Sequence, residues 1–253
     1  MQYINFFTVL LLFLSVSPGQ AQSGNGGAST PQPCRIVVIG SSTAEGVGAS
    51  SADSAWVYRY RRFLKDLHPA NEVINLAKGG YQTCHLMPSG TLLPAGRPRP
   101  DTLRNITKAL SLHPDAIIVN LPSNDVAAGY GVAEQLSNLD SIIRTGLSAG
   151  VPVWVCTTQP RHFSSEKIFS QLLVRDAIIA RYGNRVIDFW EGIAEPNGLI
   201  EMAYNSGDGI HLNNRGHRKL FERVVEKNIP AALTSFSQKT KPVQPDAERP
   251  GEH

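Results

Sequence analysis

The sequence predicts an α/β fold in which parallel strands are connected by helices. Short apolar runs alternate along the chain with amphipathic segments, the pattern of repeated strand–helix units. Two of these runs, at residues 36–39 and 117–119, contain only isoleucine and valine, as expected of strands buried on both faces of a parallel sheet. A chain of 253 residues is long enough for one such domain with a sizeable core.

The strands and helices can be assigned in order from the same pattern. Ser54 is a candidate cap for the helix expected at 54–67. Gly150 is suited to end the helix expected at 132–149, in which leucine and isoleucine recur every three or four residues. The apolar stripes of the helices indicate a packed core. We expect strands at 35–39, 73–76, 116–121, 151–156 and 186–188, and helices at 54–67, 101–112, 132–149, 168–182 and 214–228.

The two ends of the chain differ from the middle in composition. An apolar run at 6–16, too short to span a bilayer, precedes the small residues Gly19 and Ala21, which suit signal peptidase. We expect an export signal at 1–21, a linker at 22–33, a domain at 34–235 and a disordered tail at 236–253. The mature protein would then be periplasmic or extracellular, without a stable membrane anchor. No Lys or Arg precedes the apolar run, so a membrane anchor or a buried first helix stays open as an alternative.

Composition and charge argue against several other classes of protein. Hydrophobic residues make up 42% of the chain and charged residues 18%, as in globular proteins, and the net charge of +3 is modest. The basic residues at 59–65 are typical of a solvated helix face, so we expect no nucleic-acid partner. Cys34 and Cys84 fall at opposite edges of the predicted sheet, and Cys156 is expected to be a buried thiol. The histidines show no ligand spacing, and we expect neither a metal nor a cofactor.

Polar residues follow the predicted strands at the points where these strands end. Ser42 follows the first strand, Gly80 the second and Asn124 the third, and Asp208 and His211 lie in the loop after the fifth. The carboxyl ends of parallel strands meet at one edge of a sheet, so these residues should converge. A carboxylate three residues before a histidine can orient the imidazole, which can then deprotonate Ser42. The N–H groups of Ser42 and Gly80 and the amide of Asn124 are candidate donors to an oxyanion.

Simpler interpretations of the same residues exist. Residues 40–48 could form a phosphate-binding loop of a flavodoxin-like nucleotide-binding protein, although this segment lacks Gly-Lys-Ser/Thr and the interpretation leaves Asp208 and His211 unexplained. Ser42 could be a turn residue that caps the first helix, and Asn124 could merely shape a turn.

Four short blocks, in a fixed order, resemble those of the SGNH (GDSL-type) hydrolases, a family of serine esterases. Residues 40–43 read Gly-Ser-Ser-Thr, which aligns Ser42 with the nucleophile of that family, and an asparagine precedes Gly80 by five residues. Residues 122–125 read Pro-Ser-Asn-Asp and residues 208–211 read Asp-Gly-Ile-His, which match the family's third and fifth blocks. Ser41 stands where many members have aspartate, and Pro122 stands where they have glycine.

The resemblance covers residues 35–230 and implies a three-layer α/β/α sandwich with a flavodoxin-like, five-stranded parallel sheet. It implies a metal-independent esterase with a Ser42–Asp208–His211 triad and an oxyanion hole of Ser42, Gly80 and Asn124, acting on small-molecule or polysaccharide esters. The family also contains lysophospholipases, lipases and thioesterases, and a catalytically silent carbohydrate-binding protein is the alternative of another class.

The loops at the strand ends favour a short-acyl carbohydrate O-acetylesterase. No long apolar insertion is present to build an acyl tunnel or a lid. The loops instead carry polar and aromatic residues that suit hydroxyl-rich ligands, namely Lys78, Tyr81, Gln82, Gln159, Arg161 and Trp190.

Overall fold

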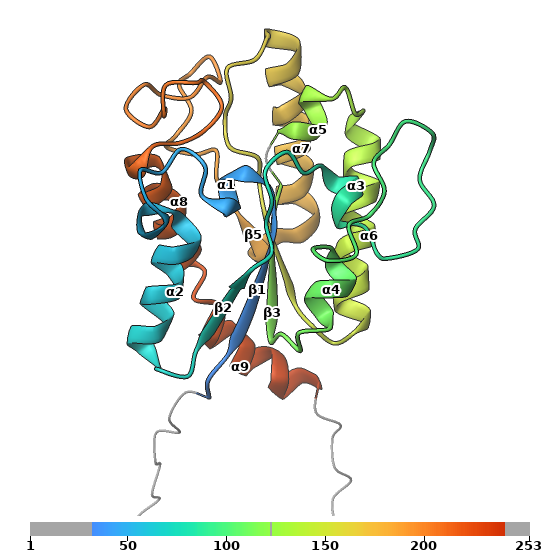
Figure 1. Ribbon diagram of the computed structural model, residues 1–253, viewed down its shortest axis with the longest axis vertical. Coiled ribbons are helices and arrows are strands. Elements are labelled where there is room, and N and C mark those ends of the chain that lie inside the picture. Colours follow the sequence, from blue (N-terminus) through green and yellow to red (C-terminus); the bar gives the residue numbers. More distant parts are fainter. Residues whose placement is uncertain (1–31, 122, 241–253) are drawn as a thin grey trace, which may run out of the picture. The chain divides into compact units, whose positions relative to one another are not determined.

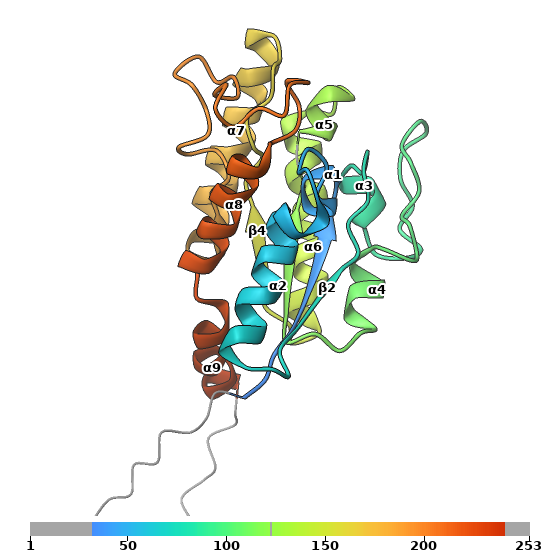
Figure 2. The ribbon, with the colours of Figure 1, turned by 60° about the vertical axis from the view of Figure 1, so that its left-hand side comes forward.

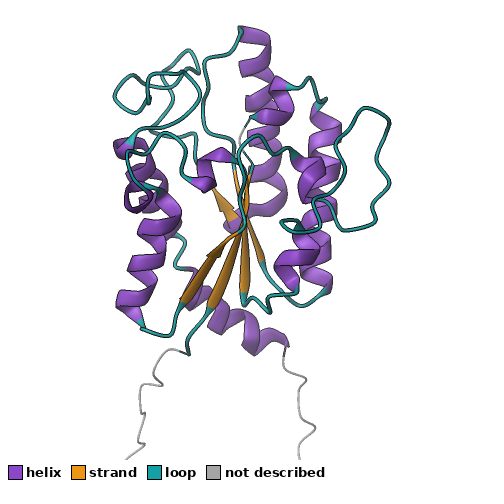
Figure 3. Cartoon of the chain, viewed as in Figure 1, coloured by secondary structure: helices purple, strands orange, loops and turns teal. Residues whose placement is uncertain are grey.

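The computed structural model describes residues 32–121 and 123–240. Within these ranges the predicted α/β fold is confirmed: one all-parallel sheet has the strand order β2-β1-β3-β4-β5, with helices on both faces (Figures 1 and 3). The strands are β1 (Arg35–Gly40), β2 (Glu72–Asn75), β3 (Ala116–Asn120), β4 (Val153–Cys156) and β5 (Val186–Ile187). The expected export signal, the linker up to residue 31 and the tail from residue 241 lie outside the described residues.

The helices alternate with these strands, and none of those described is long and apolar enough to cross a bilayer. Two single 3₁₀ turns, Ala52–Ser54 and Gly183–Arg185, precede α2 and β5. The helices are α1 (Ser42–Glu45), α2 (Trp56–Leu67), α3 (Thr83–Leu86), α4 (Ile106–Leu110), α5 (Asn124–Ala127), α6 (Val132–Ser148), α7 (Ser165–Tyr182), α8 (Asn214–Glu226) and α9 (Ile229–Thr240).

The sheet separates two hydrophobic cores, as the alternation of side chains along β1 shows. Ile36 and Val38 pack into a core with α2, α8 and α9, whereas Val37 and Ile39 pack into a core with α4, α6 and α7. Figures 1 and 2 show these two groups of helices on opposite sides of the sheet. All four side chains are fully buried. The three-layer arrangement therefore explains why this strand has no polar face.

The ends of two elements differ from the prediction. The helix expected at 101–112 begins only at Ile106, since the side chain of Asn105 accepts a hydrogen bond from the N–H of Lys108 and caps it there. Asp101 is instead bound to the hydroxyl of Tyr81, and Leu103 is 70% exposed. The boundary expected at residue 235 lies inside α9, so residues 236–240 are helical.

Two other helices also begin at different residues from those expected. The helix expected from Ser54 begins at Trp56, because Ser54 belongs to the preceding 3₁₀ turn and its side chain does not cap α2. The helix expected from Ile168 begins at Ser165, three residues earlier. The expected periodicity was therefore correct for these helices, and only their first turns were placed wrongly.

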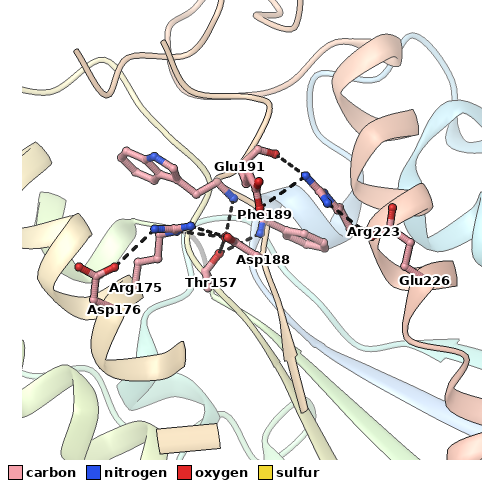
Figure 4. A network of polar contacts seen from close by, with 9 residues as sticks. Thr157, Arg175, Asp176, Asp188, Phe189, Glu191, Arg223 and Glu226 are labelled. Carbon is pink, nitrogen blue, oxygen red and sulfur yellow. Dashed lines mark hydrogen bonds and ion pairs between the residues drawn. The ribbon is translucent and has the colours of Figure 1, made fainter. Parts of the chain in front are cut away.

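The end of β5 is held by an ion pair with α7 (Figure 4). The carboxylate of Asp188 accepts hydrogen bonds from Arg175 at 2.6 Å and from the hydroxyl of Thr157 at 2.8 Å. It also accepts one from the N–H of Trp190 at 3.1 Å, so the chain turns after Ile187 instead of continuing the strand. Farther along the same loop, Arg223 of α8 donates to the carbonyl of Glu191. The start of the loop that leads to Asp208 and His211 is thus fixed to α7 and α8.

A buried histidine joins α8 to the loop between α1 and α2. His217 is fully buried, and its two ring nitrogens face the N–H of Trp56 at 3.4 Å and the carbonyl of Val47 at 3.1 Å. One nitrogen must therefore accept and the other donate, which requires the neutral ring. Burial lowers the pKa of His217 to about 4.

We expect His217 to make folding stability depend on pH. The neutral ring is favoured in the folded state, so the unfolded chain binds the additional proton between pH 6.5 and about 4. The resulting stability is complete above pH 6.5 and is lost as the pH falls, by up to about 3 kcal/mol. Asp125, whose pKa burial raises to about 6, contributes in the opposite sense.

Urea unfolding measured from pH 7 to pH 4 checks this expectation. In His217→Gln the slope of the free energy of unfolding against pH should become shallower than in the wild type. The exposed His113 provides the control, as His113→Asn should keep the wild-type slope. An unchanged slope in His217→Gln would contradict the assignment.

Candidate active site

Ser42 lies at the point where the order of the strands reverses. It is the first residue of α1, separated by one residue from the end of β1 and next to the end of β3, and it is 8% exposed. Its Oγ lies 3.0 Å from Nε2 of His211, which is 169 residues away in the sequence. The N–H of Ser42 meets no acceptor within the described residues. The side chain and the N–H of Ser42 are therefore both available to a reacting group.

His211 is oriented by the carboxylate that precedes it. Nδ1 of His211 lies 2.6 Å from Oδ2 of Asp208, and Oδ1 of Asp208 accepts the N–H groups of Ile210 and His211, each at 2.8 Å. Burial alone would raise the pKa of Asp208, but these hydrogen bonds from His211 and Ile210 outweigh it and hold the pKa below its ordinary value. Asp208 is thus an anion that places the proton of the neutral imidazole on Nδ1 and leaves Nε2 free to accept.

The loop after α1 packs closely against this pair through a glycine. Gly48 has φ +94°, and a Cβ there would lie 2.4 Å from the carbonyl oxygen of Leu212 and 2.9 Å from Cβ of His211. A side chain at residue 48 would therefore displace His211. This packing explains the glycine at residue 48 without the phosphate-binding loop considered for residues 40–48.

Asn124 is the first residue of α5 and follows β3. Its Nδ2 donates to Oγ of Ser41 at 2.8 Å and to the carbonyl of Tyr81 at 3.0 Å. Ser41 is fully buried beside Ser42 and accepts this hydrogen bond across 83 residues. The sequence suggested no contact for Ser41. The amide is thus held at the site by two acceptors with which a substrate oxygen would compete.

The loop after β2 is fastened to α1 by backbone and side-chain contacts. The N–H of Gly79 donates to the carboxylate of Glu45 at 2.7 Å, and the amide of Asn75 donates to the carbonyl of Ala44 at 2.7 Å. Gly80 has φ +80°, which a side chain would strain, and a Cβ there would point into open space. Its N–H meets no acceptor in the part of the chain described. Glu45, three residues after Ser42, could have been suspected only from this one-turn spacing.

Several of the loop residues expected to face a ligand are buried. Tyr81 is 6% exposed, with its ring stacked on His85, and Gln159 is 1% exposed and donates to the hydroxyl of Thr43. Trp190 is 8% exposed. Tyr81 and Gln159 are thus engaged in contacts within the protein, and the expectation that the three groups contact a sugar stays a prediction. Lys78 remains exposed, and Arg161 is partly exposed.

The thiols do not form disulfides. Cys34, Cys84 and Cys156 are all free and buried. Burial raises the pKa of each thiol, which keeps all three protonated and unreactive. Across the described residues, no three His, Cys, Asp or Glu side chains gather as a metal site would require.

The arrangement can perform acyl transfer. A serine hydroxyl, an imidazole and a carboxylate lie in hydrogen-bonded sequence, and two free N–H groups and an amide belong to loops that meet beside the serine. Such a site can attack a carbonyl carbon and stabilise the oxyanion that forms.

Comparison with known proteins identifies relatives of this fold. The sequence model of the GDSL-like Lipase/Acylhydrolase family matches residues 38–219. No curated protein matches the chain in sequence.

Solved structures resemble the chain over most of its length, at identities that establish a shared fold only. A lipase/acylhydrolase from Enterococcus faecalis is 19% identical with a TM-score of 0.57, covering 84% of this chain and 100% of its own. An acetyl xylan esterase, AlAXEase, is 16% identical with a TM-score of 0.57, covering 76% and 98%. A G-D-S-L family protein from Desulfitobacterium hafniense DCB-2 is 11% identical with a TM-score of 0.58, covering 77% and 99%.

Proposed function

Because the chain belongs to the GDSL-like lipase/acylhydrolase family, it is a carboxylic ester hydrolase, and we propose that Ser42, His211 and Asp208 are its catalytic triad. The observation that carries this proposal is the unbroken series of contacts from Oγ of Ser42 to Nε2 of His211 at 3.0 Å and from Nδ1 of His211 to Asp208 at 2.6 Å. Nε2 accepts the hydroxyl proton as Oγ attacks the ester carbon. Asp208 stabilises the imidazolium that results.

The oxyanion of the tetrahedral intermediate is stabilised by the N–H groups of Ser42 and Gly80 and by the amide of Asn124. When the oxyanion forms, the amide gives up its hydrogen bond to Ser41 or to the carbonyl of Tyr81 and donates to the oxyanion instead. Collapse of the intermediate breaks the C–O bond to the alcohol, which takes the proton from His211. Water then attacks the acyl-Ser42 ester, again with His211 as base, and releases the acid.

The substrate we propose is a short acyl ester of a carbohydrate, with acetyl as the acyl group. The support for a short acyl group is that the loops at the strand ends contain no long apolar insertion that could build an acyl tunnel or a lid. Export, as expected from residues 1–21, would bring the enzyme to acetylated polysaccharides. Similar structures include an acetyl xylan esterase and a lipase/acylhydrolase, so this fold serves both substrate classes.

We predict that Ser42→Ala lowers kcat for 4-nitrophenyl acetate by about three orders of magnitude or more, because the nucleophile is lost. Ser41→Ala should have a much smaller effect, since Ser41 acts only through its contact with Asn124. The circular dichroism spectra of both variants should match that of the wild type. A larger loss in Ser41→Ala than in Ser42→Ala would mean that the nucleophile has been misassigned.

Asn124→Ala should lower kcat by about 100- to 1,000-fold, because one preorganised donor is removed from the oxyanion hole. KM should change much less than kcat, as the donor acts mainly in the transition state. Steady-state kinetics with the same ester measure both constants. Wild-type turnover in Asn124→Ala would exclude the amide from the mechanism.

The substrate class is checked by comparing kcat/KM for 4-nitrophenyl acetate and for the octanoate, together with acetate release from acetylated polysaccharides. We expect the acetate ester to be preferred and acetate to be released. A preference for octanoate with no acetate released would indicate a lipase, lysophospholipase or thioesterase. Binding to a polysaccharide without any ester turnover would indicate a catalytically silent carbohydrate-binding protein.

A further inference from the structure

Two cations approach the same aromatic ring beside the proposed oxyanion hole. The guanidinium of Arg161 lies 4.6 Å from the ring centroid of Phe163, and Nζ of Lys167 lies 5.4 Å from it. Both residues also contact the segment of α5 that begins with Asn124. Arg161 donates to Oδ1 of Asn124 at 3.5 Å, and Lys167 donates to the carbonyl of Ala127 at 3.3 Å.

Neither cation has a carboxylate partner among the described residues. Each has one long hydrogen bond to a neutral oxygen. Most of the five N–H donors of the Arg161 guanidinium are therefore unused. The nearest anion in the triad, Asp208, is already bound to His211, and Asp208 still interacts electrostatically with Arg161. Arg161 therefore contacts the proposed oxyanion donor Asn124 and lies within electrostatic reach of the triad.

Arg161 is partly buried, and burial weakens the hydration of its guanidinium. An anion bound to Arg161 would offset this cost, and Lys167, at the same ring, could contribute to holding it. The planar fork of arginine matches the two oxygens of a carboxylate or of a phosphate, and lysine adds a point charge. The unused donors of this pair thus fit an oxygen-rich anion better than a neutral hydroxyl group.

We propose that Arg161 and Lys167 form a subsite for an anionic group of the substrate, so that the enzyme prefers esters that carry a carboxylate or a phosphate near the scissile bond. This inference rests on the proposed function. Among acetylated carbohydrates, it points to those with acidic sugars, whose carboxylate lies a few bonds from the esterified hydroxyl.

Three phenyl acetates differing in one substituent test the subsite: 4-acetoxybenzoate, 4-acetoxyphenyl phosphate and the neutral methyl 4-acetoxybenzoate. In Arg161→Gln, kcat/KM for an anionic ester relative to the neutral ester should fall by about 10- to 100-fold. Lys167→Gln should lower the ratio less, and Arg161→Lys should restore part of it. The anionic ester with the larger loss identifies the preferred group.

The exposed Arg144 on α6 provides the matched control, and Arg144→Gln should keep the wild-type ratio. An unchanged ratio in Arg161→Gln, or an equal loss on all three esters, would overturn the subsite. The equal loss would mean that Arg161 acts only through Asn124.

A binding measurement separates the subsite from the proposed hydrolysis. Wild-type protein should bind 4-hydroxybenzoate more tightly than its methyl ester, and Arg161→Gln should lose that difference. This result would support the subsite even if no ester were hydrolysed, an outcome that would contradict the proposed function alone. Equal binding of the two ligands by the wild type would overturn the subsite.

Discussion

The pairing of β1 with β2 on one side and with β3 on the other is the constraint on which the rest of the structure depends. Hydrogen bonds along both edges and burial of its side chains from Ile36 onward leave this strand no freedom of register. The order of the strands reverses here, because the chain passes from β1 to β2 on one side and then returns to β3 on the other. The loops after these three strands therefore open at one point of the sheet edge, which is where α/β proteins bind ligands.

Residues at this point contact the loop that follows β5, the strand at one edge of the sheet. The ion pair of Asp188 with Arg175 fixes the start of that loop at the end of β5, and the loop ends where α8 begins at Asn214. Gly48 then allows the turn after α1 to pack directly on His211. A contact across 169 residues is thus supported by α1 on one side and by a loop fixed at both of its ends on the other.

Acidic and basic side chains play different parts around the site. The acidic groups are already bound: Glu45 to the N–H of Gly79, Asp101 to the hydroxyl of Tyr81, and Asp208 to His211. They hold loops and the imidazole in place. Arg161 and Lys167 form no ion pair within the described residues, and their hydrogen bonds go to neutral oxygens, so donors remain for a ligand. The same division explains why a chain with a modest net charge can offer a positive subsite.

The sequence by itself determined the fold class and the approximate positions of the strands, because apolar periodicity follows local rules. It did not determine where α4 begins, since the Asn105 cap and the bond from Tyr81 to Asp101 compete with a leucine spacing that suits a longer helix. Nor did it determine that Gln159 and Trp190 are buried or that Ser41 accepts from Asn124. Burial and hydrogen bonds between residues far apart in the chain depend on how the loops pack, and only the tertiary structure decided them.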